Sequence, residues 1–270
     1  MSRRFAVSTL GMPGRPLAES AALAARAGCD GLEIRTHADE EVNVDAGDRR
    51  LRSLRTVVED AGLQVACLAG YVRVCAEAPP GNVESDLRRL IDAAQSMGAP
   101  SIRVFPGGAP GDTARGRARL HAVLPELETA GVQLLVETHD SHPTVRAARE
   151  LVAPLERPEQ FGVLWDAVHP WLAGESPACS RSLAGEHLAY FQIKDLALHP
   201  KDRDRPLPAV PGEGDLPLGE FARALQGWHS DAGGRDAWIS LEWELAWYPE
   251  IGSVRPALEQ AGRWFQALAE

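Results

Sequence analysis

Short apolar segments alternate with longer segments of helical periodicity along the whole chain. The apolar segments have the length and the Val, Ile and Leu content of strands that are buried on both faces of a parallel sheet. Glycine often follows a helical segment directly, as it does at a helix C-cap. The expected strands are 5–9, 30–35, 63–69, 101–105, 132–137, 162–166, 188–194 and 238–244. The expected helices are 17–27, 49–61, 83–97, 115–130, 143–151, 177–186, 217–227 and 253–268, of which 177–186 is the least defined.

The regular alternation of strands and helices predicts an α/β fold with a parallel sheet. Eight strand–helix units in 270 residues predict a (β/α)8 TIM barrel, a fold of about 250 residues, as a single domain over residues 1–270. The longest irregular segment, 197–215, is rich in proline and follows the seventh strand. We expect this segment to be a mobile cover over the mouth of the barrel.

The composition of the chain limits which binding partners and which cellular compartment we expect. The chain has 28 basic and 38 acidic residues, a balance that disfavours a nucleic-acid partner. The four cysteines show no C-x-x-C spacing and favour reduced thiols. No apolar segment approaches the ~18 residues of a membrane span, and the N-terminal one is too short for a signal peptide. We therefore expect a cytoplasmic protein that binds neither nucleic acid nor membrane; a homodimer is left open.

Three of the predicted strands carry an acidic residue at or near their carboxyl ends. These residues are Glu137, Asp166 and Glu242. A carboxylate at the end of a buried strand is costly unless a cation compensates it, and the carboxyl ends of barrel strands converge on one mouth. The pattern therefore favours a metal site. The alternative is a set of buried ion pairs with basic residues of other strands, namely Arg35, Arg103 and Lys194.

The seventh strand adds Gln192, Lys194 and Asp195 at the same end of the barrel. Acids together with an amide make a site of mostly oxygen ligands, which suits Mn2+, Mg2+ or Co2+. A zinc hydrolase would instead need clustered histidines. We therefore expect a divalent cation of the harder kind rather than Zn2+.

Four further side chains are candidates for substrate binding. His169 follows Asp166 by three residues and His139 follows Glu137 by two, so both rings can face the same pocket. Glu33 and Arg35 share one face of the second strand, where they can either contact a polar ligand or pair with each other. We also assign Lys194 to the substrate; its charge and those of Arg35, Arg73 and Lys201 could meet a phosphate.

Two weaker signals lie near the predicted mouth. The glycines of Gly212-Glu213-Gly214 could let backbone N–H groups approach a ligand, or they could form a plain turn. Trp171 and Trp247 could form the wall of a sugar site.

Taken in order, these segments resemble the sugar phosphate isomerase/epimerase superfamily. Its members are xylose isomerase-like TIM barrels, related to AP endonuclease family 2, and include hydroxypyruvate isomerase, inosose dehydratase and ketose 3-epimerases. The resemblance covers essentially the whole chain. It is carried by the first strand with the helix over 17–28, residues 30–35, the Asp166-x-x-His169 turn, the Lys194-Asp195 strand end, the Gly212-x-Gly214 loop and residues 240–244.

The resemblance implies a ligand set for one divalent cation. In the family a Glu, an Asp, a His and a Glu on strands five to eight bind the metal, and these positions correspond to Glu137, Asp166, Gln192 and Glu242. Gln192 is a departure, because the family usually has histidine there. The resemblance also implies that His169 contacts the substrate.

The implied function is a metal-dependent isomerase or epimerase of a small sugar, ketose or polyol that acts through a metal-stabilised enediolate. Glu137 and Glu242 would be catalytic and exchange the proton, with Glu244 in reserve. One alternative is a lyase that dehydrates an inosose-like or shikimate-like compound. The other is a catalytically silent barrel that binds a ligand, which the substitution at Gln192 leaves open. In every case the expected partner is a small carbohydrate or a related molecule.

Overall fold

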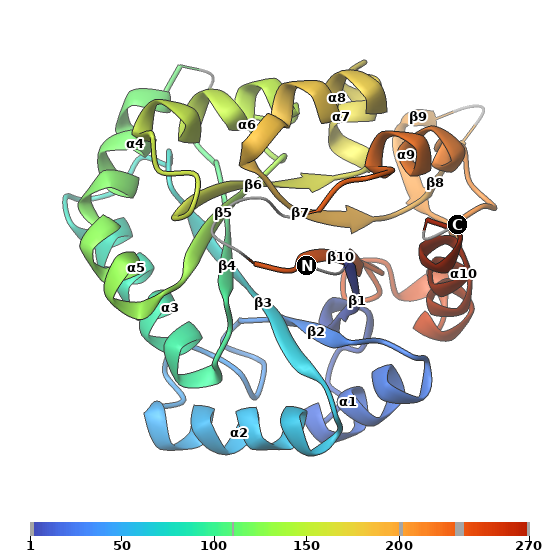
Figure 1. Ribbon diagram of the computed structural model, residues 1–270, viewed down its shortest axis with the longest axis horizontal. Helices are drawn as coiled ribbons and strands as arrows, with labels where there is room; N and C mark the ends of the chain where they lie inside the picture. Colours follow the sequence, from blue (N-terminus) through green and yellow to red (C-terminus); the bar gives the residue numbers. More distant parts are fainter. Residues whose placement is uncertain (1–2, 110, 200–201, 230–234, 269–270) are drawn as a thin grey trace.

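A closed barrel of eight parallel strands forms the centre of the molecule, and the helices surround it (Figure 1). The computed structural model describes residues 3–109, 111–199, 202–229 and 235–268. The strand order around the barrel is β1-β10-β7-β6-β5-β4-β3-β2, which confirms the predicted (β/α)8 TIM barrel. The barrel strands are β1 Arg3–Ser8, β2 Gly31–Arg35, β3 Gln64–Arg73, β4 Ser101–Phe105, β5 Gln133–Glu137, β6 Phe161–Asp166, β7 Leu188–Ile193 and β10 Ala237–Leu241.

The helices lie close to their predicted positions, with two exceptions. The segment predicted as one helix over 115–130 is two helices, because Pro125 lies in the first turn of the second one, where its missing N–H is tolerated. The short helix α7 directly after β6 was not predicted. The helices are α1 Leu17–Arg26, α2 Asp48–Asp60, α3 Asn82–Met97, α4 Thr113–Ala122, α5 Leu124–Ala130, α6 Val145–Val152, α7 Val168–Leu172, α8 Pro177–Ala184, α9 Leu218–Leu225 and α10 Val254–Ala267.

Apolar side chains form two buried clusters. The larger one packs the helices against the outside of the strands. The smaller one comes entirely from strands and fills the inside of the barrel; it comprises Ala6, Ala66, Cys67, Leu135, Leu164, Ala189, Tyr190 and Trp238. Gly31 lies beside this inner cluster, where a Cβ atom would come within 2.6 Å of the Gln64 carbonyl oxygen. Only glycine fits this close approach of neighbouring strands.

The segment 197–215 was predicted to be irregular, and this was wrong for its first part, which belongs to an antiparallel hairpin of β8 (Leu196–His199) and β9 (Asp202–Pro208) outside the barrel. Residues 209–215 contain neither strand nor helix, as predicted. The prolines of this segment are compatible with strand structure, because both strands of a two-stranded sheet are edge strands. Residues 200–201 of the predicted cover lie outside the described residues.

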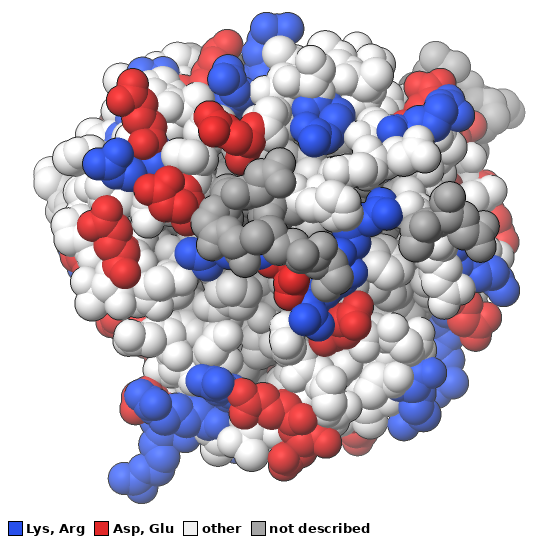
Figure 2. Space-filling model, viewed as in Figure 1, with Lys and Arg blue, Asp and Glu red and all other residues white. Residues whose placement is uncertain are grey.

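The surface charge and the lengths of the helices bear on possible partners, and the structure also shows the state of the cysteines. Lys and Arg are interspersed with Asp and Glu on the face shown in Figure 2. Across the described ranges, no helix is both long enough and apolar enough to span a membrane. The four cysteines are free thiols, as expected; Cys179 is exposed and the others are buried.

Candidate active site

Three carboxylates meet at the carboxyl end of the barrel, as the strand pattern predicted. Glu137 is the last residue of β5, Asp166 is the last residue of β6, and Glu242 directly follows β10. An oxygen atom of each lies within 4.8 Å of an oxygen of the other two. All three side chains are buried, with Asp166 fully enclosed. The three belong to strands far apart in the sequence, and closure of the barrel brings them together.

Two basic side chains lie within the same cluster. On β4, the Arg103 Nε atom is 3.1 Å from Glu137 Oε2, at ion-pair distance but without hydrogen-bond alignment. Lys194, directly after β7, places its Nζ atom 2.7 Å from Asp166 Oδ2 and in contact with Glu242 Oε2. The buried ion pairs considered as the alternative to a metal are therefore present for Arg103 and Lys194.

Gln192 lies between the acids of neighbouring strands. It is in register with Asp166 on β6 and with Ser240 on β10. Its Nε2 atom donates hydrogen bonds to Glu33 Oε1 at 2.9 Å and to Glu242 Oε1 at 3.2 Å. Its Oε1 atom is buried and has no hydrogen-bond partner among the described residues. The amide oxygen is thus free to bind a ligand, and its role as a metal ligand stays a prediction.

The cluster contains more acids than bases. Two bases, Arg103 and Lys194, serve five carboxylates: Glu33, Glu137, Asp166, Glu242 and Glu244.

This imbalance appears in the acidity of the buried groups. Burial, together with the charge of Glu242, raises the pKa of Glu33 to about 7. Burial is also the main reason why the pKa of Glu137 lies well above its usual value, although Arg103 opposes the shift. Burial would raise the pKa of Asp166 as well, but the charge of Lys194, together with the smaller influence of His169 and the hydrogen bonds from both residues, outweighs burial and brings the pKa to about 2. A site short of positive charge, with several oxygen donors, is suited to a divalent cation.

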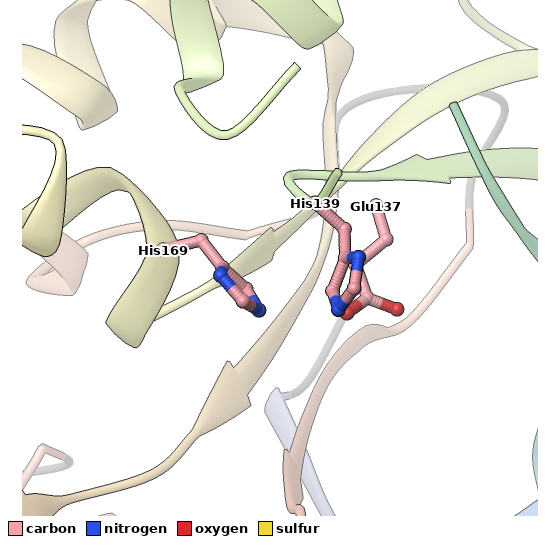
Figure 3. A group of neighbouring side chains, drawn as sticks. All are labelled: Glu137, His139 and His169. Atoms are coloured by element: carbon pink, nitrogen blue, oxygen red, sulfur yellow. The ribbon is translucent and has the colours of Figure 1, made fainter. Parts of the chain in front are cut away.

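His139 and His169 face the same space as Glu137, as Figure 3 shows. Their ring centroids are 4.3 Å apart, and one nitrogen of each ring lies within 4.8 Å of a Glu137 oxygen. Burial lowers the pKa of both imidazoles and favours their neutral form. A neutral imidazole can donate or accept a hydrogen bond with a hydroxyl group, or it can bind a metal.

Glu33 and Arg35 do not pair with each other, although both are buried. Glu33 accepts the hydrogen bond from Gln192, whereas Arg35 binds Asp39, Glu40 and Tyr71. The guanidinium carbon of Arg35 also lies 5.5 Å from the ring centroid of Tyr71 and 5.3 Å from that of Trp247. The charge of Arg35 is therefore already compensated, and its contact with a substrate stays a prediction.

A cavity of about 290 Å³ opens beside the carboxylates. Its polar lining consists of His139, His169, Lys194, Asp195, Glu242 and Glu244. Its apolar lining includes residues of α7 and of the hairpin: Val168, Leu172, Leu196, Pro206, Pro208 and Ala209. Trp247 also lines the cavity, as predicted, and is 52% exposed at the mouth; Trp171 is not among the lining residues. The predicted cover therefore does border the site, although as a hairpin, and its mobility stays a prediction.

Arg103 was predicted only as one of three possible ion-pair partners of the acids. In the structure it is 3% exposed and lies over the ring of Phe105, with its charge directed at Glu137 and Glu242. An arginine within the apolar run Ser101-Ile102-Arg103-Val104-Phe105 was the available signal, because such a strand has no solvent to hold the charge.

Asp195 fixes the loop that leads from the hairpin to α9. Its two carboxylate oxygens accept hydrogen bonds from the backbone N–H groups of Leu196, Gly212, Gly214 and Leu216. Gly212 has φ +93°, and a Cβ atom at Gly214 would collide with the Asp195 carboxylate. The backbone N–H groups of the two glycines therefore donate to the side chain of Asp195.

We expect Asp195→Ala to lower the free energy of unfolding by about 2–4 kcal/mol, because it leaves buried backbone donors without an acceptor. Urea denaturation measures this change. Asp195→Asn keeps one acceptor oxygen and should cost less. Equal stability of the alanine variant and the wild type would show that the loop is held by other contacts.

Several solved structures have a similar fold. The structure is similar to a D-psicose 3-epimerase with D-tagatose from Clostridium cellulolyticum H10, with a TM-score of 0.75 and 14% identity over 98% of each chain. It is similar to the probable 3-DHS dehydratase AsbF involved in petrobactin synthesis from Bacillus anthracis, with a TM-score of 0.75 and 16% identity over 96% of this chain and 97% of that one. It is also similar to the IOLI protein with a zinc atom, with a TM-score of 0.74 and 16% identity over 98% and 97% of the two chains.

These likenesses show a shared fold. A comparison with curated proteins finds no match. The family model described as the xylose isomerase-like TIM barrel matches residues 21–268. This match confirms the resemblance on which the sequence interpretation rests: the chain belongs to the xylose isomerase-like TIM barrel family.

Proposed function

We propose that this protein is a divalent-metal-dependent isomerase or epimerase of a small sugar, ketose or sugar-like polyol. The observation that carries the proposal is the meeting of Glu137, Asp166 and Glu242 within 4.8 Å at the mouth of the barrel. Two further observations support the proposal. The chain belongs to the xylose isomerase-like TIM barrel family, and its structure is similar to that of a D-psicose 3-epimerase. The proposed cation ligands are these three carboxylates and the amide oxygen of Gln192.

The chemistry follows from the surroundings of each group. A bound divalent cation would supply a Lewis acid that stabilises negative charge on substrate oxygens. Glu137 is proposed to take and return the proton on the substrate carbon next to the oxygen that the cation would bind, because burial raises its pKa and so makes the carboxylate a stronger base. Glu242, across the cluster, is the proposed partner for the opposite face of that carbon. His139 and His169 would hydrogen-bond hydroxyl groups, and Trp247 would pack against the apolar face of a sugar.

Deuterium exchange tests the proposal. The protein, loaded with Mn2+ or Mg2+ in D2O, is incubated with a panel of ketoses and cyclitols. An isomerase or epimerase incorporates deuterium at the reacting carbon and yields an isomer of equal mass apart from the label. A dehydratase loses water instead, an outcome considered because the structure is also similar to a probable dehydratase. Neither exchange nor product across the panel, or full turnover in the presence of a chelator, would contradict the proposal.

Exchanging the ligand at position 192 gives a separate prediction. Gln192→His should tighten the binding of Zn2+ or Co2+ relative to Mg2+, because imidazole is a softer ligand than an amide oxygen. The ratio of dissociation constants, measured by calorimetry for the variant and the wild type, reports this preference. An unchanged ratio would place residue 192 outside the coordination sphere.

A further inference from the structure

We infer that Lys194 is a built-in counter-ion that occupies the carboxylate site without metal and moves out toward Glu244 when a divalent cation binds. This inference rests on the proposed function, because it concerns the same site. It assigns to Lys194 control of metal binding rather than contact with the substrate.

The first step is the position of the ammonium group. Lys194 Nζ lies 2.7 Å from Asp166 Oδ2, contacts Glu242 Oε2, and lies 2.9 Å from Glu244 Oε1. The side chain is 7% exposed. Three carboxylates around one buried point charge form an arrangement of the kind that would hold a metal ion.

The second step is that metal and ammonium need the same atoms. Asp166 Oδ1 already accepts hydrogen bonds from the backbone N–H groups of Val168 and His169, at 2.7 and 3.1 Å. The oxygen left for a cation is Oδ2, the atom that faces Lys194. Glu242 Oε1 accepts the hydrogen bond from Gln192, which leaves Oε2, again the atom in contact with Lys194. A cation bound to Asp166 and Glu242 therefore displaces the ammonium from both.

The third step is the path for displacement. Glu244 lies two residues after Glu242 and is 24% exposed, whereas Asp166 and Glu242 are buried. Glu244 and Lys194 both line the cavity beside the cluster. The ammonium can turn outward and keep one carboxylate partner, so a flexible lysine stem moves its charge without leaving it unpaired.

Metal affinity gives the first test, with Mn2+ as the probe and calorimetry as the readout. Lys194→Met should bind Mn2+ about tenfold more tightly or better, because the competing charge is gone. Glu244→Gln should weaken Mn2+ binding in the wild-type background, because the displaced ammonium loses its partner. In the Lys194→Met background the same change should have little effect. Equal effects of Glu244→Gln in both backgrounds would show that general electrostatics, not exchange, sets the affinity, and would overturn the inference.

Lysine labelling gives a second test that needs no variant. Lys194 and Lys201 are the only lysines in the sequence, and Lys201, which lies outside the described residues, serves as the reference within the same molecule. Acetic anhydride labelling followed by mass spectrometry should modify Lys194 slowly without metal and several-fold faster with saturating Mn2+. Unchanged or slower labelling with Mn2+ bound would overturn the inference and leave the proposed function standing. Failure of both the wild type and Lys194→Met to bind any divalent cation would overturn both.

Discussion

Glu137→Gln is expected to lower kcat by about 10³-fold while the protein stays folded. The amide keeps the shape of the carboxyl group but can neither accept the substrate proton nor carry a full negative charge. The fold should tolerate the change, because glutamine has nearly the same volume as glutamate and keeps one side-chain oxygen that can face the guanidinium of Arg103. Glu242 also stays within 4.0 Å of Arg103 Nη2 and continues to compensate part of its charge.

Steady-state kinetics on a substrate found by deuterium exchange measure this effect, and thermal unfolding verifies the fold. Glu128→Gln, on the exposed surface of α5, makes the same chemical change far from the barrel mouth and should leave kcat unaltered. Activity close to that of the wild type in Glu137→Gln would remove Glu137 from proton transfer. Loss of activity together with loss of bound metal would assign Glu137 to metal binding alone.

The barrel and the ends of its strands were predictable because one physical signal determines both. A run of apolar residues that stops at an acid marks a buried strand and its exit point, and barrel closure then fixes where the exit points meet. Glu137 and Asp166 end their strands as predicted. Glu242 directly follows β10, which ends at Leu241 rather than at the predicted residue 244. The three-residue spacing of His169 from Asp166 likewise predicted that the His169 ring faces the same pocket. In the structure this ring, on α7, lies next to the ring of His139.

Contacts between side chains were less predictable, because they depend on where flexible groups turn within the barrel. Nothing in the sequence distinguishes the roles of Arg35 and Arg103: each is a single arginine in an apolar strand. The structure turns Arg35 toward Asp39 and Glu40 at the rim, whereas Arg103 faces Glu137 inside. The hairpin of β8 and β9 was missed for another reason: its prolines suggest irregular backbone, and only the pairing of two edge strands makes them compatible with a sheet.

The buried charge of Arg103 leads to the largest expected effect on stability. Arg103→Met should lower the free energy of unfolding by about 3–5 kcal/mol, because removal of one partner leaves buried carboxylates without compensation. The arginine is 3% exposed and is paired with Glu137 and, more distantly, with Glu242. Methionine fills much of the space of the stem, but it gives up the contact of the guanidinium with the Phe105 ring, whose centroid is 4.2 Å from Cζ. Urea denaturation in the absence of metal provides the measurement.

A double variant separates lost charge compensation from lost packing. Arg103→Met combined with Glu137→Gln removes both members of the closest pair, so the second change should restore about 1–3 kcal/mol of the stability that the first removes. The restoration should be incomplete, because Glu242 also loses the nearby positive charge of Arg103. If the two changes are additive, packing rather than charge accounts for the destabilisation. A divalent cation should also stabilise Arg103→Met more than it stabilises the wild type, because it supplies positive charge to the same carboxylates.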